Sequence, residues 1–443
     1  MRLCQEWRCI SSSRLVWPRG LEFNPPVATA FYDTIIIGGG PGGSAAGTLL
    51  AKAGQRVLVL EKEIFPRFHI GESLLPYNHD IFREMGVLPE LEAAGLIRKH
   101  GAQFHLSNGS KSIALLFRNG RFTRETTAFQ VERATFDHIL LKHTRSCGAE
   151  VREGWTVTQF SQDTGGVTVA ATGPDGAKET FRATHLVDAS GRANLTGNQE
   201  GLREVHPRLK KLSLFGHFAG VKLDPGEKGG DTVIIRLEDK WFWIMPLSAE
   251  KTSVGCVMDK EAFLQSKETP EQQFHRLWQG SSVLRERLSD ARLLGGIHTT
   301  ADFSYRNRRL AGARLLRVGD AAGFMDPIFS SGVFLAMYSG RLAAQTILQL
   351  AATPGAEALL ADYERRVNRA MDFYWEMVEG FYTTPFMELF MEPRNKWSLA
   401  SAVLAVLAGE LEAGWQIHWR MRLFFWLVRL QAKRPFMPRI SFD

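Results

Sequence analysis

The stretch from Thr34 to Glu61, TIIIGGGPGGSAAGTLLAKAGQRVLVLE, limits the choice of fold more than any other part of this chain. It opens with an apolar run and passes through Gly38, Gly40 and Gly43 at GxGxxG spacing. It then continues through small residues, beginning with Ser44, to a second apolar run. This order predicts a strand, a glycine turn, a helix and a second strand, as at the start of an α/β domain.

The glycine spacing indicates a dinucleotide site. Glycines let the backbone turn tightly and approach a pyrophosphate, and the first amides of the helix donate to its negative charge. Glu61 ends the second run, where a carboxylate accepts hydrogen bonds from a ribose. An ordinary glycine-rich turn would leave this acid unexplained. We therefore expect a cofactor to contact Gly38, Gly40, Gly43, Ser44 and Glu61.

Composition excludes several classes of protein. A chain of 443 residues with 44% hydrophobic content is long enough for two joined globular domains or for one large α/β unit with insertions. The net charge of +7 includes no block of lysine or arginine, so we expect no nucleic-acid partner. The apolar run that comes nearest to a membrane span, residues 399–407, is too short to cross a bilayer, so we expect no transmembrane segment.

The cysteines and the N-terminal segment suggest where the protein works. Cys4, Cys9, Cys147 and Cys256 form neither a metal-ligand pattern nor a CxxC redox pair, so we expect no metal site and a reduced, cytoplasmic location. Residues 1–30 contain arginines, serines and paired prolines without a periodic apolar pattern. We expect a disordered extension there, with a targeting peptide or a start codon assigned too far upstream as alternatives.

Later segments supply further candidate ligands if the dinucleotide is FAD. The loop after the second strand carries Arg67, and another strand ends at Arg133 before a helix. An apolar strand ends at Asp188 in small residues that let a cofactor lie against its edge. A further apolar strand runs into Gly319 and Asp320, and Asp320 is placed to bind a ribityl hydroxyl of the flavin.

The loop after this last strand has the features of an anion site. It contains Pro327, and Ser331 and Gly332 follow where a long helix is predicted to begin. Backbone amides at a helix N-terminus bind anions, and the residues alone leave a flavin oxygen, a halide or both as candidates. We expect Pro327 and Gly332 to contact the cofactor, and Ser331 and Gly332 to bind a halide.

Residues 212–260 contain β-rich runs separated by turn residues, which predicts antiparallel strands. Trp241 and Trp243 lie two residues apart, so a strand would place both indoles on one face. The pair is either part of a sheet core or a wall between the cofactor and a second chamber. The same choice between core and cavity applies to aromatic residues of the predicted C-terminal helices, namely Trp415, Trp419, Phe424, Phe425 and Trp426.

Four separated segments, GGGPGGSAAG, FPRFHIGESLLP, WFWIMP and GDAAGFMDPIFSSG, together resemble the flavin-dependent halogenases, most closely their phenol and pyrrole branch. This family resembles the para-hydroxybenzoate-hydroxylase type of flavoprotein in fold. The family motif WxWxIP maps onto Trp241, Trp243, Met245 and Pro246, with methionine in place of isoleucine. The replacement keeps an apolar side chain of similar size.

The resemblance implies an α/β protein with a Rossmann-like FAD-binding domain, an inserted antiparallel β-sheet substrate domain and a helical C-terminal region. We expect the FAD-binding domain to be discontinuous and to comprise residues 31–200 and 300–350. Residues 201–299 should form the β-rich substrate domain, and residues 351–443 the helical region.

The resemblance also implies an FADH2-dependent halogenase. In this family a separate flavin reductase supplies FADH2, which reacts with oxygen to give a C4a-hydroperoxide that chloride or bromide attacks. The hypohalous acid then travels through a tunnel to a lysine, which the KHGA segment places at Lys99. The halide site falls on Ser331 and Gly332, and Trp241 and Trp243 keep the substrate away from the flavin.

The implied substrate is an electron-rich ring, in the form of a free phenol, a pyrrole, an indole or an acyl group tethered to an acyl carrier protein. Phe329 stands where tryptophan halogenases carry glutamate, which argues against free tryptophan. The alternatives are a geranylgeranyl-reductase-like flavoprotein, an aromatic monooxygenase, and a flavin-binding protein with a degenerate site. Without the resemblance, Lys99 would be interpreted as an ordinary surface lysine.

Overall fold

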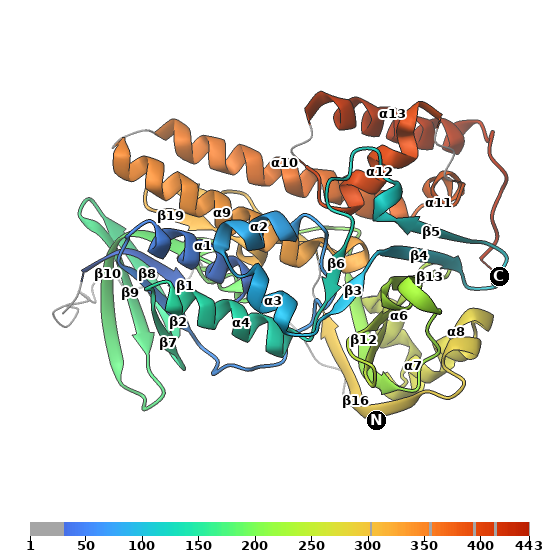
Figure 1. Cartoon of the computed structure of the whole chain (residues 1–443), viewed down its shortest axis with the longest axis horizontal. Coiled ribbons are helices and arrows are strands. Elements are labelled where there is room, and N and C mark those ends of the chain that lie inside the picture. The colour runs from blue at the N-terminus through green and yellow to red at the C-terminus, as the bar shows by residue number, and fades with distance from the viewer. Residues whose placement is uncertain (1–30, 302–303, 354–356, 393–395, 412–413, 443) are drawn as a thin grey trace, which may run out of the picture.

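The computed structural model describes residues 31–301, 304–353, 357–392, 396–411 and 414–442. The extension expected over residues 1–30 lies outside the described residues, as do Cys4 and Cys9. Two large sheets, two small ones and a helical C-terminal part make up the fold, which confirms the α/β class (Figure 1).

The strands are β1 (Phe31–Ile37), β2 (Val57–Glu61), β3 (Ile97–Lys99), β4 (Gly101–Leu106), β5 (Ser112–Leu116), β6 (Ala128–Gln130), β7 (Glu150–Glu153), β8 (Thr156–Asp163), β9 (Gly166–Thr172), β10 (Lys178–Asp188), β11 (Arg203–Val205), β12 (Lys211–Ala219), β13 (Thr232–Arg236), β14 (Trp241–Pro246), β15 (Thr252–Asp259), β16 (Arg292–Ala301), β17 (Tyr305–Asn307), β18 (Ala311–Gly312), β19 (Leu315–Arg317) and β20 (Gly323–Phe324). The α-helices are α1 (Pro41–Lys52), α2 (Asn78–Met85), α3 (Leu88–Ala93), α4 (Arg133–Ser146), α5 (Leu195–Gln199), α6 (Lys260–Ser266), α7 (Pro270–Gln279), α8 (Ser282–Arg287), α9 (Ser331–Ala352), α10 (Glu357–Phe381), α11 (Thr384–Phe390), α12 (Leu399–Leu407) and α13 (Gly414–Lys433).

The first large sheet carries the predicted dinucleotide unit. Its main strand order is β18-β19-β10-β1-β2-β7, and β9 and β8 extend it from β10. Strand β1, helix α1 and strand β2 follow one another as predicted, and β1 pairs in parallel with both β2 and β10. Helices α1 and α9 can cross closely because Gly340 has no side chain. A Cβ at this position would lie only 2.4 Å from the carbonyl oxygen of Gly42.

The second large sheet has the order β16-β12-β15-β14-β13-β4-β5, and strands β12 to β15 confirm the β-rich region expected near residues 212–260. Strand β4 pairs in parallel with β13, while the other pairs are antiparallel. Strands β4 and β5 come from within the range expected for the FAD-binding domain. The chain therefore contributes β4 and β5 to the second sheet, returns to the first sheet for β7 to β10, and then contributes β12 to β16 to the second sheet.

The C-terminal region is helical as expected, and Leu115 of β5 packs against a buried cluster that includes Leu404 of α12. Phe424 and Phe425 are buried in the core. Trp415 and Trp426, however, are 74% and 52% exposed, so the expectation that they lie in a core or a cavity is wrong. Helix α13 packs one face on α11 and α12, and these two indoles lie on its solvent face.

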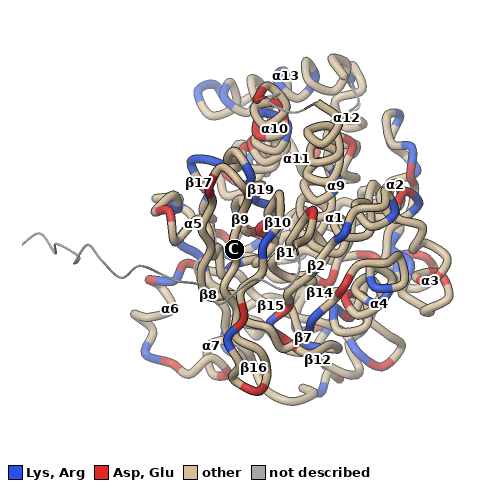
Figure 2. The backbone as a smooth tube through the Cα atoms, turned by 90° about the vertical axis from the view of Figure 1, so that its left-hand side faces the viewer, with Lys and Arg blue, Asp and Glu red and all other residues tan. Residues whose placement is uncertain are grey.

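Charged residues of both signs are distributed over the surface elements, as Figure 2 shows. Among the described residues, no group of three His, Cys, Asp or Glu side chains is arranged to hold a metal ion. The helices of the same described part include none that is long and apolar enough to cross a bilayer.

Candidate active site

A cavity of about 680 Å³ extends from the glycine turn between β1 and α1 to the second large sheet. Most predicted cofactor residues line it, together with Trp241 and Trp243; these cofactor residues are Gly38, Gly40, Glu61, Arg67, Arg133, Gly319, Asp320, Pro327 and Gly332. Of the residues predicted to contact the cofactor or the halide, four do not line this cavity, namely Gly43, Ser44, Asp188 and Ser331. We call this space the cofactor cavity.

Close backbone contacts shape the glycine turn. A Cβ at Gly43 would lie 1.9 Å from the carbonyl oxygen of Gly38, so only glycine fits there. Glu61 accepts a 2.6 Å hydrogen bond from the N–H of Gly39, which fixes the carboxylate beside the turn. Ser44 donates to the Gly39 carbonyl at 3.0 Å. Gly43 and Ser44 therefore act on the cavity through the shape of the turn.

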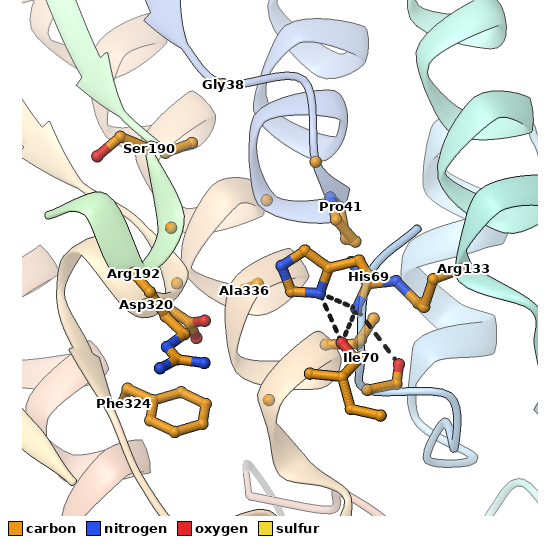
Figure 3. A pocket seen from close by; sticks show the side chains of 18 of the residues that line it. Gly38, Pro41, His69, Ile70, Arg133, Ser190, Arg192, Asp320, Phe324 and Ala336 are labelled. Carbon is orange, nitrogen blue, oxygen red and sulfur yellow. Dashed lines mark hydrogen bonds between the residues drawn. The ribbon is translucent and has the colours of Figure 1, made fainter. Parts of the chain in front are cut away.

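One buried carboxylate holds two arginines at the cavity. Arg133 donates to Asp137 through two 2.8 Å hydrogen bonds, and Arg67 donates to the same carboxylate at 2.7 Å. Burial alone would raise the pKa of Asp137, but the two guanidinium groups hold it below its usual value. Burial also lowers the pKa of His69 to about 4, which leaves this ring neutral. Figure 3 shows His69 and Arg133 near Pro41, at the start of α1, where a pyrophosphate would be bound.

Arg192, Asp320 and Phe324 lie on the other side of the cavity in Figure 3. The Arg192 guanidinium carbon is 5.5 Å from the ring centre of Phe324, and Arg192 also donates to the Thr300 hydroxyl at 2.6 Å. Burial raises the pKa of Asp320 to about 6, which leaves the carboxylate ionised at neutral pH. Asp320 therefore offers an acceptor for a hydroxyl group of a bound cofactor.

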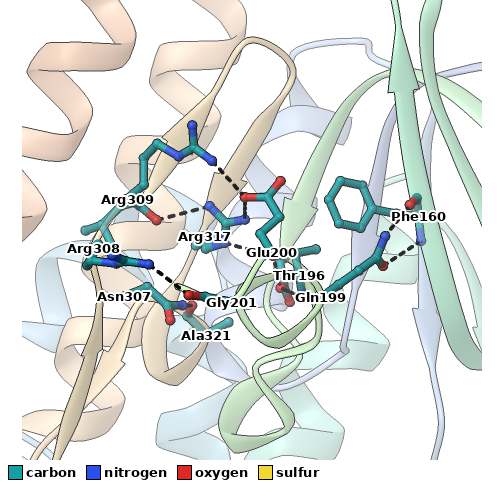
Figure 4. Close-up of polar contacts among 12 residues, drawn as sticks. Phe160, Thr196, Gln199, Glu200, Gly201, Asn307, Arg308, Arg309, Arg317 and Ala321 are labelled. Carbon is teal, nitrogen blue, oxygen red and sulfur yellow. Dashed lines mark hydrogen bonds and ion pairs between the residues drawn. The ribbon is translucent and has the colours of Figure 1, made fainter. Parts of the chain in front are cut away.

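Asp188 shapes a wall of the cavity without lining it. Its carboxylate accepts hydrogen bonds from the N–H groups of Ser190 at 3.0 Å and Thr196 at 2.9 Å. The buried Arg317 donates to the Thr196 hydroxyl at 2.9 Å and to Glu200 at 2.7 Å, as Figure 4 shows for this network. These bonds hold the loop whose residues Ser190 to Ala193 line the cavity.

The indoles of Trp241 and Trp243 lie on one face of β14, with ring centres 5.8 Å apart. Trp243 donates to the Ser253 hydroxyl at 3.0 Å, and its ring covers Gly255, where a Cβ would lie 2.2 Å from the indole. Trp241 donates to the hydroxyl of Tyr382 at 2.9 Å. Both rings are buried and both line the cofactor cavity, so the pair forms part of its wall.

Lys99 is the last residue of β3 and is only 2% exposed. Its ammonium donates to the Ser73 hydroxyl at 2.8 Å and to the Leu74 carbonyl at 3.2 Å. Burial lowers its pKa to about 7, against the opposing effect of the Asp231 carboxylate. A buried lysine with a depressed pKa is uncommon outside functional sites, which excludes the ordinary surface lysine.

Lys99 lines a second, much smaller cavity of about 20 Å³, which we call the lysine chamber. Its other lining residues are mostly apolar and come from β4, β5, β13, α12 and the segments before α2, after β5 and before α9. They are Leu75, Ala102, Phe104, Leu115, Phe117, Thr232, Ile234, Ile328, Phe329, Ser330, Leu404 and Leu407. Ser330 lines both cavities and has a φ of +56°, which is unusual for a residue with a side chain. The two cavities therefore meet at the loop before α9.

Sequence reasoning missed several residues of this arrangement. Ser330, and not the predicted Ser331, lines the two cavities, because the left-handed conformation of Ser330 turns the chain just before α9 begins. Asp137 was also missed, although it stands four residues after Arg133, a spacing that pairs charges on a helix. Nothing in the sequence indicated Tyr382, because its partners are distant in the chain.

The residues of the cofactor cavity fit FAD. The turn at Gly43 has no room for a side chain, as close approach of a pyrophosphate requires. Arg67 and Arg133 supply cationic donors, whereas Glu61 and Asp320 supply acceptors for hydroxyl groups. A Cβ at Gly332 would meet no atom within 4 Å, so this backbone is open toward the cavity.

Comparisons with known proteins agree with this fit. A family model described as an FAD binding domain matches residues 31–379. The 1H-pyrrole-2-carbonyl-(peptidyl-carrier protein) chlorinase of Pseudomonas fluorescens is 30% identical over 409 residues, which cover 86% of this chain and 90% of the relative. A tryptophan 2-halogenase of Chondromyces crocatus is 34% identical over 356 residues, covering 79% of this chain and 67% of the relative.

The solved structures extend the likeness to the fold. The structure of a flavin-dependent brominase aligns with a TM-score of 0.81 at 29% identity, covering 91% of this chain and all of the other. This coverage is larger than that of the family model, which ends at residue 379. By its FAD-binding fold and by its identity to halogenases over most of its length, this chain belongs to the flavin-dependent halogenases.

Proposed function

We propose that this enzyme makes hypohalous acid in the cofactor cavity and uses it, at Lys99, to halogenate an electron-rich aromatic ring. The supporting observation is the position of Lys99. Its buried ammonium lines an apolar chamber and is hydrogen-bonded at 2.8 Å to Ser73, which lines the cofactor cavity. A separate flavin reductase supplies the reduced cofactor, and chloride or bromide supplies the halogen.

Reduced FAD, when bound, supplies the oxygen activation that converts halide into hypohalous acid. Arg67 and Arg133 would bind its pyrophosphate, and Asp320 would orient its hydroxyl groups. Gly332, whose backbone is open to the cavity, would bind the halide together with the neighbouring amide of Ser331. Trp241 and Trp243 would keep the organic substrate away from the flavin.

Lys99 would act on the hypohalous acid through a hydrogen bond. Its ammonium donates to the oxygen of the acid and so makes the halogen more electrophilic. A ring carbon forms a bond to the halogen while the halogen–oxygen bond breaks. The hydroxide that leaves combines with the ring proton as water. Because the chamber around Lys99 is apolar, the hydrogen bond is stronger there than in bulk water.

The substrate class follows from the chamber and from the relatives. Its wall of leucine and phenylalanine side chains suits a flat ring, and its small volume requires movement of α12 or of the loop before α9 to admit one. The chlorinase relative acts on a pyrrole held by a carrier protein, so a carrier-tethered pyrrole is the first candidate. Free phenols and indoles come next, since another relative is a tryptophan 2-halogenase.

The test is reconstitution of the purified protein with FAD, a flavin reductase, NADH and either chloride or bromide. The substrates are pyrrole-2-carbonyl on an acyl carrier protein, free phenols and free indoles, and mass spectrometry detects the halogen isotope pattern. Wild-type protein should give a halogenated product, and Lys99→Ala should give none while binding FAD normally. A hydroxylated product would contradict the proposal and favour a monooxygenase.

Lys52→Ala is a matched control for the loss of a lysine. Lys52 also donates to two carbonyl groups, those of Glu84 and Met85 at 3.0 Å, but it lies at the end of α1 and lines neither cavity. Product formation by Lys52→Ala should match the wild type. Equal losses in the two variants would show that Lys99 matters only for folding.

A further inference from the structure

Tyr382 connects three parts of the molecule that are distant in sequence. It follows α10 directly, in the C-terminal region, and lies beyond the last residue, 379, that the FAD-binding family model matches. Its hydroxyl accepts a 2.9 Å hydrogen bond from Trp241 and donates a 2.6 Å hydrogen bond to Asp326. Trp241 and Asp326 are both fully buried, where an unmade hydrogen bond is costly.

Each partner of Tyr382 belongs to the boundary between the two cavities. Trp241 lines the cofactor cavity. Asp326 accepts a 3.2 Å hydrogen bond from the N–H of Ile328 and so sets the turn that leads to Ser330, the residue shared by both cavities. A second contact supports the first, because the ring of Phe329 packs edge-on against Phe381 with centres 5.8 Å apart.

The ring of Tyr382 is also fixed by cations of the second sheet. The Lys211 ammonium lies 4.1 Å from its centre, and the Arg236 guanidinium carbon lies 5.5 Å away. Burial and the neighbouring Asp326 raise the pKa of Tyr382 well above its ordinary value, so the phenol stays protonated and donates. Asp326, whose pKa burial raises to about 6, is ionised at neutral pH and accepts.

We propose that Tyr382 is a positioning residue that holds Trp241 and the loop from Asp326 to Ser330 together across the boundary between the cofactor cavity and the lysine chamber. The C-terminal helical region is then part of the reaction machinery, since it fixes the shape of this boundary. With the boundary intact, hypohalous acid reaches Lys99; with the boundary loosened, the acid escapes into solution. This role rests on the proposed halogenation. The hydrogen bonds that join Trp241, Tyr382 and Asp326 do not depend on that proposal.

Tyr382→Phe tests this role because it keeps the ring and removes both hydrogen bonds. Halogenated product formed per reduced flavin oxidised should fall roughly tenfold, since small misplacements around a reacting group have large effects on its reaction. Monochlorodimedone in the assay should report a matching rise in escaped hypohalous acid. FAD affinity and the rate of flavin oxidation should stay at wild-type values. Asp326→Asn should show the same pattern if Tyr382→Phe proves too unstable to purify.

Tyr374→Phe is the matched control. Tyr374 is a buried tyrosine of α10 whose hydroxyl donates to the Val406 carbonyl at 2.9 Å, and it contacts neither Trp241 nor Asp326 through a hydrogen bond. Product per flavin oxidised should be unchanged in this variant. An equal yield from Tyr382→Phe and Tyr374→Phe would overturn the positioning role.

A second measurement does not depend on activity. Trp241 and Trp243, with ring centres 5.8 Å apart, should give an exciton couplet in circular dichroism, obtained by subtracting the spectrum of Trp243→Phe. Tyr382→Phe should change this couplet, and Tyr374→Phe should not. If the wild type yields no halogenated product, the proposed function fails, and the couplet alone decides whether Tyr382 positions Trp241. An unchanged couplet in Tyr382→Phe would overturn the inference in either case.

Discussion

The Lys99 ammonium and the Ser73 hydroxyl lie 2.8 Å apart, and this hydrogen bond joins the two cavities of the enzyme. Ser73 lines the cofactor cavity, whereas Lys99 lines the lysine chamber. The hydroxyl of Thr232, which also lines the chamber, lies 3.0 Å from that of Ser73. Lys99, Ser73 and Thr232 thus form a polar path between the cofactor cavity and the lysine chamber, whose lining is otherwise mostly apolar.

Ser73→Ala removes the side-chain acceptor of Lys99 and leaves only the Leu74 carbonyl. Halogenation should fall by roughly ten- to a hundredfold, because the lost bond to a charged group is worth about 1.5 to 3 kcal/mol. Its pH profile should move toward lower pH, since the ammonium form loses a stabilising partner. Ser146→Ala, which removes a hydroxyl bonded only within α4, serves as control. An unchanged profile in Ser73→Ala would contradict the role of this bond.

Lys99→Met should change how stability depends on pH. The pKa of Lys99 is about 7 in the folded protein and near 10.5 in the unfolded chain, so between these values the unfolded state binds more protons. Stability of the wild type should therefore rise with pH across this window, by at most roughly 1.4 kcal/mol per pH unit from this group. Urea unfolding of both proteins at several pH values measures the difference. If the free energy of unfolding changes with pH in the same way in the two proteins, burial does not lower the pKa of Lys99.

Gly43→Val should abolish FAD binding. The first atom of any side chain at Gly43 would lie 1.9 Å from the Gly38 carbonyl oxygen, which forces the turn open. Gly296→Ala is a control, because a Cβ there meets no atom within 4 Å. Flavin fluorescence quenching on titration measures both affinities. Normal FAD affinity in Gly43→Val would contradict the assignment of this turn.

Trp243→Ala should let the organic substrate approach the flavin. Removing an indole that lines the cofactor cavity should cost about 3 to 5 kcal/mol of stability and produce uncoupled flavin oxidation or a hydroxylated product. Peroxide release and product mass are the measurements. Trp278→Ala in α7, which lines neither cavity, controls for loss of a large side chain. Unchanged coupling in Trp243→Ala would count against a wall of tryptophan.

Leu404→Ala should enlarge the lysine chamber. Leu404 is buried on α12 and lines the chamber, whereas Val403 on the same helix is buried but does not line it. Bulkier rings should become substrates in Leu404→Ala but not in Val403→Ala, and each variant should lose about 1 to 5 kcal/mol of stability. Competition between a small and a bulky phenol, measured as the product ratio, tests this. A product ratio unchanged from the wild type would show that the substrate ring does not bind in the lysine chamber.

Much of the fold was predictable because its signals are local. The glycine turn, the helix after it and the acid at Glu61 all lie within the segment Thr34 to Glu61, and the structure has each of them in place. The strands of residues 212–260 are β-rich runs separated by turn residues, which is also a local signal. The pairing of β4 with β13 could not be predicted, because strand order depends on contacts between distant segments.

The residues of the site also divide into those with local sequence signals and those whose role depends on distant partners. Motif residues such as Arg67, Arg133 and Asp320 line the cofactor cavity, as their spacing from strands and helices indicated. Asp188 was predicted to contact the cofactor but acts on the cavity through Ser190 and Thr196, partners that its own position does not indicate. Trp415 and Trp426 show the opposite error, since an aromatic helix does not state which of its faces will be covered.

The sequence by itself determined the cofactor class and the fold class, because each depends on short motifs whose geometry is set by neighbouring residues. Only the tertiary structure decided that Lys99 is buried, that Ser73 is its partner, and that Tyr382 joins Trp241 to Asp326. Burial and hydrogen bonding between side chains separated by many residues arise from packing of the whole chain. A local pattern therefore cannot specify them.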